Sequence, residues 1–512
     1  MSIRILLALL TGLLLVLLYP PFGFALLAPL SLTPLCLALG REFRPVARFA
    51  LGFISGLVLW AGVCWWIAPV LAVHGGMGDF GGWGTFALFC LLKSIHCGLF
   101  GLLAGVLIKH WFAPPAIALL WAVLERTQEP LTLFGWLMLG DAGIDMGLPL
   151  RVAPFAGVYG ISFLFALTAA CFAAILLKRP RQHALWALLT LLPVLLPALP
   201  AALRPAAHAA LVQPNLPTAH EANPDSYAES KAHFARLSLD ALREGPVDVV
   251  VWPETPGPMF YDEDPDLRAR VREVSTAANA PVILGTIWRD RSGAPRNSAL
   301  IAPAALRYDK MFLVPFGEYV PSLFSFVNQV SDEAGAYIPG ERISLMPIGG
   351  RKAGTFICYE SAVGHHVRNF AREGASVFFN ISNDGYFFRT PAREQHLQLV
   401  RMRAVENRRW IVRATNNGIT AVIDPAGAVR EQIPPFDRRS VRAGFGYVEE
   451  LTIFTVGGDW FIVGGALAVC AALIASQWPS YRKPRPRKPQ PSPQRKPENR
   501  PENDPPRARG SA

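Results

Sequence analysis

Residues 354-GTFICYES-361 form an apolar run that ends in Cys358, with a glutamate two positions further on. Such a run is typical of a buried strand. Polar residues that follow buried strands gather at the carboxyl edge of a sheet, where α/β domains hold their functional sites. A single thiol there could be packed in a core, form half of a disulfide, or act as a nucleophile.

The sequence around this run, over residues 206–450, alternates apolar runs with helix-like segments. We expect strands at 209–216, 247–254, 281–288, 297–302, 353–359, 376–382, 410–415 and 419–424, and helices at 225–244, 265–279 and 391–408. Fully apolar strands interleaved with helices predict an α/β domain whose sheets are covered by helices.

The composition places this domain in a membrane protein. Of 512 residues, 52% are hydrophobic and only 17% are charged, whereas soluble domains carry about 25% charged residues. A spanning helix needs about 20 mostly apolar residues. We expect eight: seven in residues 1–205, at 4–21, 24–40, 49–71, 85–108, 111–125, 153–177 and 184–202, and an eighth within 451–477, at 453–476. Segment 131–150 is apolar but contains Asp141 and Asp145, which predicts a re-entrant or interfacial loop.

The basic residues predict the orientation. Loops 41–48 and 178–183 hold three basic residues each, the tail 478–512 holds ten, and loop 74–84 holds none. Since Lys and Arg favour the cytoplasmic side, eight spans place residues 206–450 outside the cytoplasm. The tail supplies +7 of the +11 net charge, so the basic balance does not indicate nucleic acid. We expect this Pro-rich tail to be disordered and cytoplasmic, with anionic headgroups as a possible partner.

The cysteines divide into two groups. Six lie inside the predicted spans, where small soft residues pack routinely: Cys36, Cys64, Cys90, Cys97, Cys171 and Cys470. Cys358 is the only cysteine of residues 206–450. A disulfide within the domain is therefore excluded, which leaves an intermolecular disulfide, a buried inert thiol or a reactive one.

Two further polar residues follow apolar strands. Glu254 ends 250-VVWPE-254, and Lys310 opens 310-KMFLVPFGEYVP-321. Taken singly, they could be a turn carboxylate and a surface lysine. Together with Cys358 they supply a base, a cation and a soft nucleophile, which are the groups needed for acyl transfer through a thioester. His365 and His366 are adjacent rather than i, i+4 apart, so we expect ordinary surface histidines and no metal or cofactor.

The sequence resembles the nitrilase superfamily and, more narrowly, the bacterial apolipoprotein N-acyltransferase family. The resemblance covers about residues 1–476 and rests on 154-PFAGVYGISFL-164, 212-VQPNLP-217, 250-VVWPETP-256, 310-KMFLVPFGEYVP-321, 355-TFICYES-361, 380-NISNDGYF-387 and 396-HLQLVRMRAVENRRWIVRATNNGIT-420. Many relatives carry a tryptophan shortly after the second motif, whereas 218-TAHEANPDSY-227 offers only Tyr227.

The resemblance implies a four-layer αββα sandwich on the periplasmic side of the bacterial inner membrane. It implies a catalytic triad of Glu254, Lys310 and Cys358, with Glu318, Tyr359 and Glu360 as supporting neighbours. It also implies a phospholipid as acyl donor and a diacylglyceryl apolipoprotein as acceptor. Nothing in the sequence demands an oligomer, and we expect a monomer.

The chemistry of these groups predicts the mechanism. We expect Lys310 to lower the pKa of the Cys358 thiol and Glu254 to take its proton. Lys310 and a backbone N–H near Tyr359 would stabilise the oxyanion. A thioacyl-enzyme that serves two substrates in turn predicts ping-pong kinetics.

Two alternatives remain at this stage. A membrane-anchored nitrilase-like amidohydrolase would use the same triad with water as acceptor, and access to lipid would separate it from an acyltransferase. The aromatic loops 258–261, 321–330 and 385–388 could provide this access by dipping into the bilayer surface. A transporter is the other alternative. Its support is Lys93 and His96 within a predicted span, although snorkelling would explain Lys93.

Overall fold

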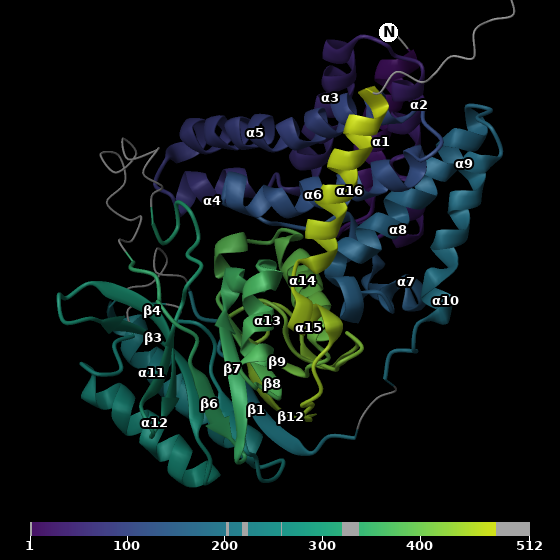
Figure 1. Ribbon diagram of the computed structural model, residues 1–512. Coiled ribbons are helices and arrows are strands. Elements are labelled where there is room, and N and C mark those ends of the chain that lie inside the picture. The colour runs from purple at the N-terminus through teal and green to yellow at the C-terminus, as the bar shows by residue number, and fades with distance from the viewer. Residues whose placement is uncertain are drawn as a thin grey trace, which may run out of the picture. The chain divides into compact units, whose positions relative to one another are not determined.

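The computed structural model describes residues 3–200, 204–217, 224–255, 257, 259–319 and 337–477. Its N-terminal half is helical, as Figure 1 shows. The helices are α1 (Ile3–Leu17), η1 (Ala25–Leu30), α2 (Thr33–Gly40), α3 (Pro45–Val63), α4 (Ile67–Val73), α5 (Gly78–Leu107), α6 (Ala113–Thr132), η2 (Leu139–Asp145), α7 (Gly147–Leu150), α8 (Ala153–Leu176), α9 (Gln182–Leu185), η3 (Trp186–Leu191) and α10 (Leu192–Leu195). Two more helices follow the sheet domain: α15 (Ile453–Gly457) and α16 (Trp460–Gln477).

Four of the described helices are long and apolar enough to cross a membrane: α3, α5, α8 and α16. They correspond to the predicted spans at 49–71, 85–108, 153–177 and 453–476. The predicted spans near 4–21, 24–40 and 184–202 contain only shorter helices, and α6 carries three charged residues in its second half. The count of eight therefore stays a prediction.

The outer faces of these helices support a lipid environment. Large apolar side chains are exposed along α1, α5, α8 and α16, among them Leu13, Leu91, Ile175 and Leu467. Rows of exposed apolar side chains are unfavourable in water and suit a bilayer. Segment 131–150 contains no helix long enough to span, as predicted, and folds instead into η2 and α7.

Two predictions for the helical half are wrong. Lys93 does not snorkel: it is fully buried, and its Nζ donates to Gln128 Oε1 at 2.7 Å and to the Phe134 carbonyl at 2.8 Å. Cys470 does not pack inside the protein, because it lies on an exposed face of α16. The other five cysteines of the predicted spans are buried, as expected.

The rest of the described chain forms two six-stranded sheets. The first has the order β12-β1-β2-β3-β4-β5 and the second β11-β10-β9-β8-β7-β6. The strands of the first sheet are β1 (Ala207–Gln213), β2 (Val249–Val251), β3 (Val282–Arg289), β4 (Pro295–Ala302), β5 (Leu306–Asp309) and β12 (Arg439–Phe445). Those of the second are β6 (Leu345–Ile348), β7 (Arg351–Ile357), β8 (Val377–Ser382), β9 (Ile411–Thr415), β10 (Thr420–Ile423) and β11 (Val429–Ile433).

Each sheet has a parallel centre: β1, β2 and β3 in the first sheet and β7, β8 and β9 in the second. The sheets pack face to face through pairs such as β1 with β9 and β4 with β7. Helices α11 (Pro224–Leu242) and α12 (Pro265–Ala278) cover the first sheet, and α13 (Gly364–Arg372) and α14 (Ala392–Asn407) cover the second. The predicted four-layer αββα sandwich is confirmed in the described residues.

Candidate active site

A buried charge cluster lies at the carboxyl edge of the first sheet. Glu254 follows β2 and Lys310 follows β5, and both are buried. The Lys310 Nζ lies 3.4 Å from Glu254 Oε1 and 2.9 Å from Glu318 Oε1. One ammonium therefore bridges two carboxylates. Away from water these charges attract strongly, and loss of either side of the pair would leave an uncompensated buried charge.

Two asparagines that the sequence reasoning missed complete this cluster. Asn297 Nδ2 donates at 2.7 Å to both Glu254 Oε1 and Glu318 Oε1. The backbone N–H of Asn383 donates to Glu254 Oε2 at 2.8 Å. Three donors thus fix the rotamer of Glu254, leaving the carboxylate little freedom to turn away from its neighbours. The position of Asn383 inside the motif 380-NISNDGYF-387 was the available signal.

The third predicted residue lies at the same place from the opposite sheet. Cys358 follows β7 and opens the short helix η5 (Cys358–Ala362). Its backbone is left-handed, with φ of 50°, which is costly for a residue with a side chain and recurs at functional sites. The charges of Glu254 and Lys310 both act on its thiol. The structure therefore brings Glu254, Lys310 and Cys358 together.

The electrostatics of Cys358 differ from the expectation. Burial raises the pKa of the thiol, the Glu254 carboxylate raises it further, and Lys310 only partly opposes them. Lys310 does act to lower this pKa, as predicted, but the net pKa is raised, because desolvation of the thiolate is the larger effect. Burial also acts to lower the pKa of Lys310, but Glu318 and Glu254 outweigh it and hold that pKa above its ordinary value. The resting pair is thus a neutral thiol beside an ammonium.

Tyr359 connects the site to the helical half. Its hydroxyl donates to the Leu133 carbonyl at 3.3 Å and accepts from the Gly135 N–H at 3.1 Å. Its ring stacks on Phe134, with centroids 5.8 Å apart and planes 13° apart. The residue after Cys358 is therefore fixed to the segment that follows α6.

A second buried contact makes the same connection. The Gln395 side chain, on α14, accepts from the indole N–H groups of Trp66 and Trp136 at 3.1 and 2.9 Å. Its amide donates to the carbonyls of Pro20 and Val63 at 3.2 and 3.1 Å. All four partners belong to the helical half, so the two halves meet through satisfied polar contacts.

Beside Tyr359 there is a cavity of about 260 Å³. Its wall is mostly aromatic and aliphatic, with one carboxylate, and comprises Glu129, Leu133, Met311, Phe312, Leu313, Tyr319, Tyr337, Pro339 and Tyr359. It lies where α6 meets the loop after Lys310.

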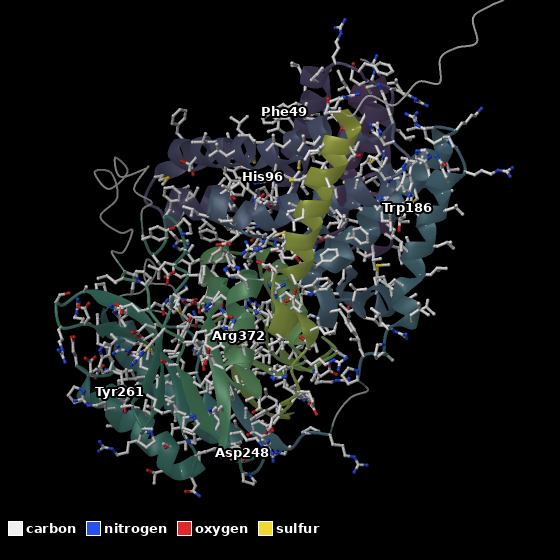
Figure 2. All side chains as sticks on the ribbon, viewed as in Figure 1. Phe49, His96, Trp186, Asp248, Tyr261 and Arg372 are labelled. Carbon is white, nitrogen blue, oxygen red and sulfur yellow. The ribbon has the colours of Figure 1, made fainter. Side chains whose placement is uncertain are left out.

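The three aromatic loops behave differently. In 258–261, Met259 is buried, so the expectation of a bilayer contact is wrong for this residue. Tyr261 is half-buried beside α12 (Figure 2), and its contact with a bilayer stays a prediction. In 385–388, Phe387 packs on Trp66 at 5.0 Å and Phe388 stacks on His74 at 4.9 Å, both in the helical half. Loop 321–330 and most of the stretch 218–227 lie outside the described residues.

The buried Glu360 carboxylate joins segments on both sides of the site by hydrogen bonds. Its Oε1 accepts from Tyr308 Oη at 2.6 Å and from the Met311 N–H at 2.7 Å, and its Oε2 accepts from the Ile357 N–H at 2.8 Å. His366 Nε2 lies 3.4 Å from Glu360 Oε1 and is buried, so its interpretation as a surface histidine is wrong. Glu360 thus ties the loop after Lys310 to the strand before Cys358.

A pH-dependent contribution to stability is expected from Glu360. Burial alone would raise the pKa of its carboxyl, but His366, Tyr308 and the Ile357 N–H hold it below the ordinary value of 4.5. A depressed pKa stabilises the fold above pH 4.5 and loses this effect as the pH falls below it. Glu360→Gln should destabilise the protein by about 1.5–3 kcal/mol at pH 7, and the difference in melting temperature from the unchanged protein should shrink below pH 4.5. A constant difference down to pH 3 would contradict this.

The comparisons with known proteins agree with this architecture. Residues 208–440 match the family model described as carbon-nitrogen hydrolase, and residues 11–171 match that of the apolipoprotein N-acyltransferase N-terminal domain. A CN-hydrolase superfamily protein from Xanthomonas campestris aligns with 52% of this chain and 96% of its own, at 18% identity and a TM-score of 0.38. The family-model match over residues 208–440 shows that the sheet domain is a carbon–nitrogen hydrolase, or nitrilase-like, domain.

Relatives that align with most of this chain show to which family the whole chain belongs. The apolipoprotein N-acyltransferase of Geobacter metallireducens is 31% identical over 91% of this chain and 94% of its own. The apolipoprotein N-acyltransferase of Pseudomonas putida is 32% identical over 92% of this chain and 95% of its own. That of Methylococcus capsulatus is 30% identical over 91% of this chain and 95% of its own. This chain belongs to the apolipoprotein N-acyltransferase family.

Proposed function

We propose that this protein transfers an acyl chain from a phospholipid to the α-amine of the N-terminal diacylglyceryl-cysteine of apolipoproteins. Cys358 carries the chain as a thioester between the two substrates. The observation that carries the proposal is the buried Glu254–Lys310 pair acting on the Cys358 thiol, with the next residue, Tyr359, hydrogen-bonded to the helical half. The site thereby adjoins the part of the chain that suits lipid.

In the first half-reaction the Cys358 sulfur attacks the ester carbonyl. Because the resting thiol is neutral, Glu254 takes its proton as the S–C bond forms. Lys310, with a backbone N–H near Tyr359, stabilises the tetrahedral oxyanion. The C–O bond then breaks, Glu254 returns the proton to the departing alcohol, and lysophospholipid leaves a thioacyl-enzyme.

In the second half-reaction the acceptor's amine attacks the thioester carbonyl. Glu254 removes a proton from the amine, the C–S bond breaks, and the sulfur leaves as a thiol after receiving that proton. The product is an amide. Glu318, Tyr359 and Glu360 support these steps by holding Lys310 and the loops on either side of Cys358.

The arrangement in the cell is part of the proposal, and the basic loops support it. We place the protein in the bacterial inner membrane as a monomer, with its catalytic domain on the periplasmic side and its basic tail in the cytoplasm. The proposed division is 1–205 for spans one to seven, 206–450 for the nitrilase-like domain, 451–477 for span eight and 478–512 for the tail.

An amidohydrolase that transfers to water would use the same three residues. It is not favoured, because the relatives that match this chain over 91% of its length are named as acyltransferases. In addition, loop 385–388 and Tyr359 direct the site toward the helical half.

Mass spectrometry of the purified protein tests the proposal. Given phospholipid vesicles, the protein should gain the mass of one acyl chain on the peptide that contains Cys358. Addition of a diacylglyceryl-cysteine peptide should discharge this adduct as an N-acylated peptide, whereas a peptide with an acetylated N-terminus should not. An adduct that only water discharges would support the hydrolase, and absence of an adduct would refute the proposed mechanism.

A further inference from the structure

A fully buried histidine lies behind the nucleophile. His396 belongs to α14, and its Nε2 lies 3.1 Å from the carbonyl oxygen of Cys358 and 2.9 Å from Ser361 Oγ. Its Nδ1 lies 2.9 Å from Asp384 Oδ1. No step of the proposed reaction uses this histidine, yet it contacts the backbone of the residue that carries the acyl chain.

The carboxylate that faces His396 is itself held in place. Arg413 Nη2 donates to Asp384 Oδ2 at 2.7 Å, and Ser382 Oγ donates to Asp384 Oδ1 at 2.8 Å. Burial alone would raise the pKa of Asp384, but Arg413 and His396 hold it below its ordinary value. An ionised Asp384 requires a donor at 2.9 Å, so His396 Nδ1 carries a proton that points at Asp384.

The other ring nitrogen faces the carbonyl of Cys358. A carbonyl oxygen only accepts hydrogen bonds, so Nε2 also carries a proton, which the Cys358 carbonyl and Ser361 Oγ share as acceptors. With an N–H on both nitrogens the ring is an imidazolium, and the Asp384 carboxylate balances its charge. Cys358 needs this contact because its left-handed φ of 50° is unfavourable for a residue with a side chain. A hydrogen bond to its carbonyl holds the peptide group that follows Cys358 in this conformation.

The ring is also braced from the helical half. Trp136 and Phe387 both lie 5.8 Å from His396, measured between ring centroids, and Trp136 donates to Gln395, the neighbour of His396 on α14. The imidazole thus packs between the residues around Cys358 and two aromatic side chains, Trp136 and Phe387, at the contact with the helical half.

We propose that His396 is a positioning residue: its Nε2–H holds the carbonyl of Cys358, and Asp384 orients the ring, so that the left-handed backbone aims the thiol at the acyl carbonyl. The proposal rests on the proposed function for the reaction that it serves. It adds a residue that touches neither substrate and acts through the nucleophile's own backbone.

A matched pair of variants tests it. In His396→Gln the side-chain amide nitrogen can take the place of Nε2 and still donate to the Cys358 carbonyl. In His396→Asn it can take the place of Nδ1, which keeps the bond to Asp384 and loses the carbonyl. We expect His396→Gln to acylate Cys358 within about tenfold of the unchanged protein and His396→Asn to be slower by about 10²-fold, the cost of a small misplacement of a reacting group.

Three measurements separate positioning from a merely structural role. For His396→Asn, kcat should fall while KM for phospholipid stays within about threefold, and the melting temperature should match that of His396→Gln. Alkylation of Cys358 by iodoacetamide, followed on its own peptide, should slow in the same order. Equal rates in both variants, or losses that track melting temperature, would overturn the proposal. Because alkylation needs no lipid, it reports on His396 even if no thioacyl-enzyme forms.

Discussion

Cys358→Ala is expected to abolish N-acylation, with a fall in rate of at least about 10⁴-fold. Without the sulfur, Glu254 and Lys310 remain in place but have no atom to which the acyl chain can be transferred. Both half-reactions are lost together, since each forms or breaks the same C–S bond. The measurement is product formation from phospholipid and a diacylglyceryl-cysteine peptide, alongside the intact mass of the protein after exposure to vesicles.

Cys470→Ala is the matched control for this variant. Its thiol is exposed on α16 and lies outside the sandwich, so the variant should keep full activity and a normal acyl adduct. The Cys358 side chain is half-buried, and Cys358→Ala removes only one sulfur atom from the site. The melting temperature of this variant should therefore stay close to that of the unchanged protein. Retained turnover in Cys358→Ala would disprove the thioacyl mechanism, whatever the activity of the control.

The sandwich could be predicted from the sequence because its central strands are apolar on both faces. All eight predicted strands occur, and the strands that were missed are the edges of the two sheets: β5, β6, β11 and β12. An edge strand has fewer buried neighbours and tolerates polar residues, as 439-RSVRAGF-445 does. Its sequence therefore lacks the continuous apolar run that identifies an interior strand.

The candidate site was predictable only where a polar residue directly follows an apolar strand. Glu254 and Cys358 have this pattern, and Lys310 follows a short strand. Asn297 and His396 do not, because they act through hydrogen bonds to residues that are 43 and 38 positions away in the chain. Such contacts depend on how the two sheets and α14 pack, and no local pattern encodes them.

Burial explains the remaining errors. The pKa of the Cys358 thiol depends on how completely the site is desolvated, and this outweighs the neighbouring ammonium. In the same way, Lys93 looked like a lysine that could reach the membrane surface, but Gln128 and the Phe134 carbonyl satisfy its ammonium inside the helical half. Which groups pair with a buried side chain depends on the tertiary structure, and the local sequence does not reveal these partners.

Glu254→Gln should slow both half-reactions by about 10²–10⁴-fold, the range typical of a lost general base. The substitution keeps the size of the side chain but cannot take a proton from the thiol or from the acceptor's amine. Since the thiol is neutral at rest, its attack depends on that proton transfer more than the attack of a preformed thiolate would.

Some loss of stability will accompany this variant. The Glu254 oxygens accept hydrogen bonds from Asn297, Lys310 and the Asn383 N–H. In the glutamine variant an NH₂ group replaces one of these oxygens and cannot accept, so part of this set of hydrogen bonds is lost. The cost should be about 1–3 kcal/mol, so rates must be taken from protein shown to be folded. Glu273→Gln, on the exposed face of α12, removes a carboxylate without touching the site and should leave the rate unchanged.

Single-turnover measurements decide the role of Glu254. Formation of the thioacyl adduct and its discharge by the acceptor peptide should slow by similar factors, because one carboxylate takes the proton in each step. Slowing of the first step alone would mean that another group deprotonates the amine. Folded Glu254→Gln protein that forms and discharges the adduct at the normal rate would leave Glu254 as an electrostatic partner of Lys310 and nothing more.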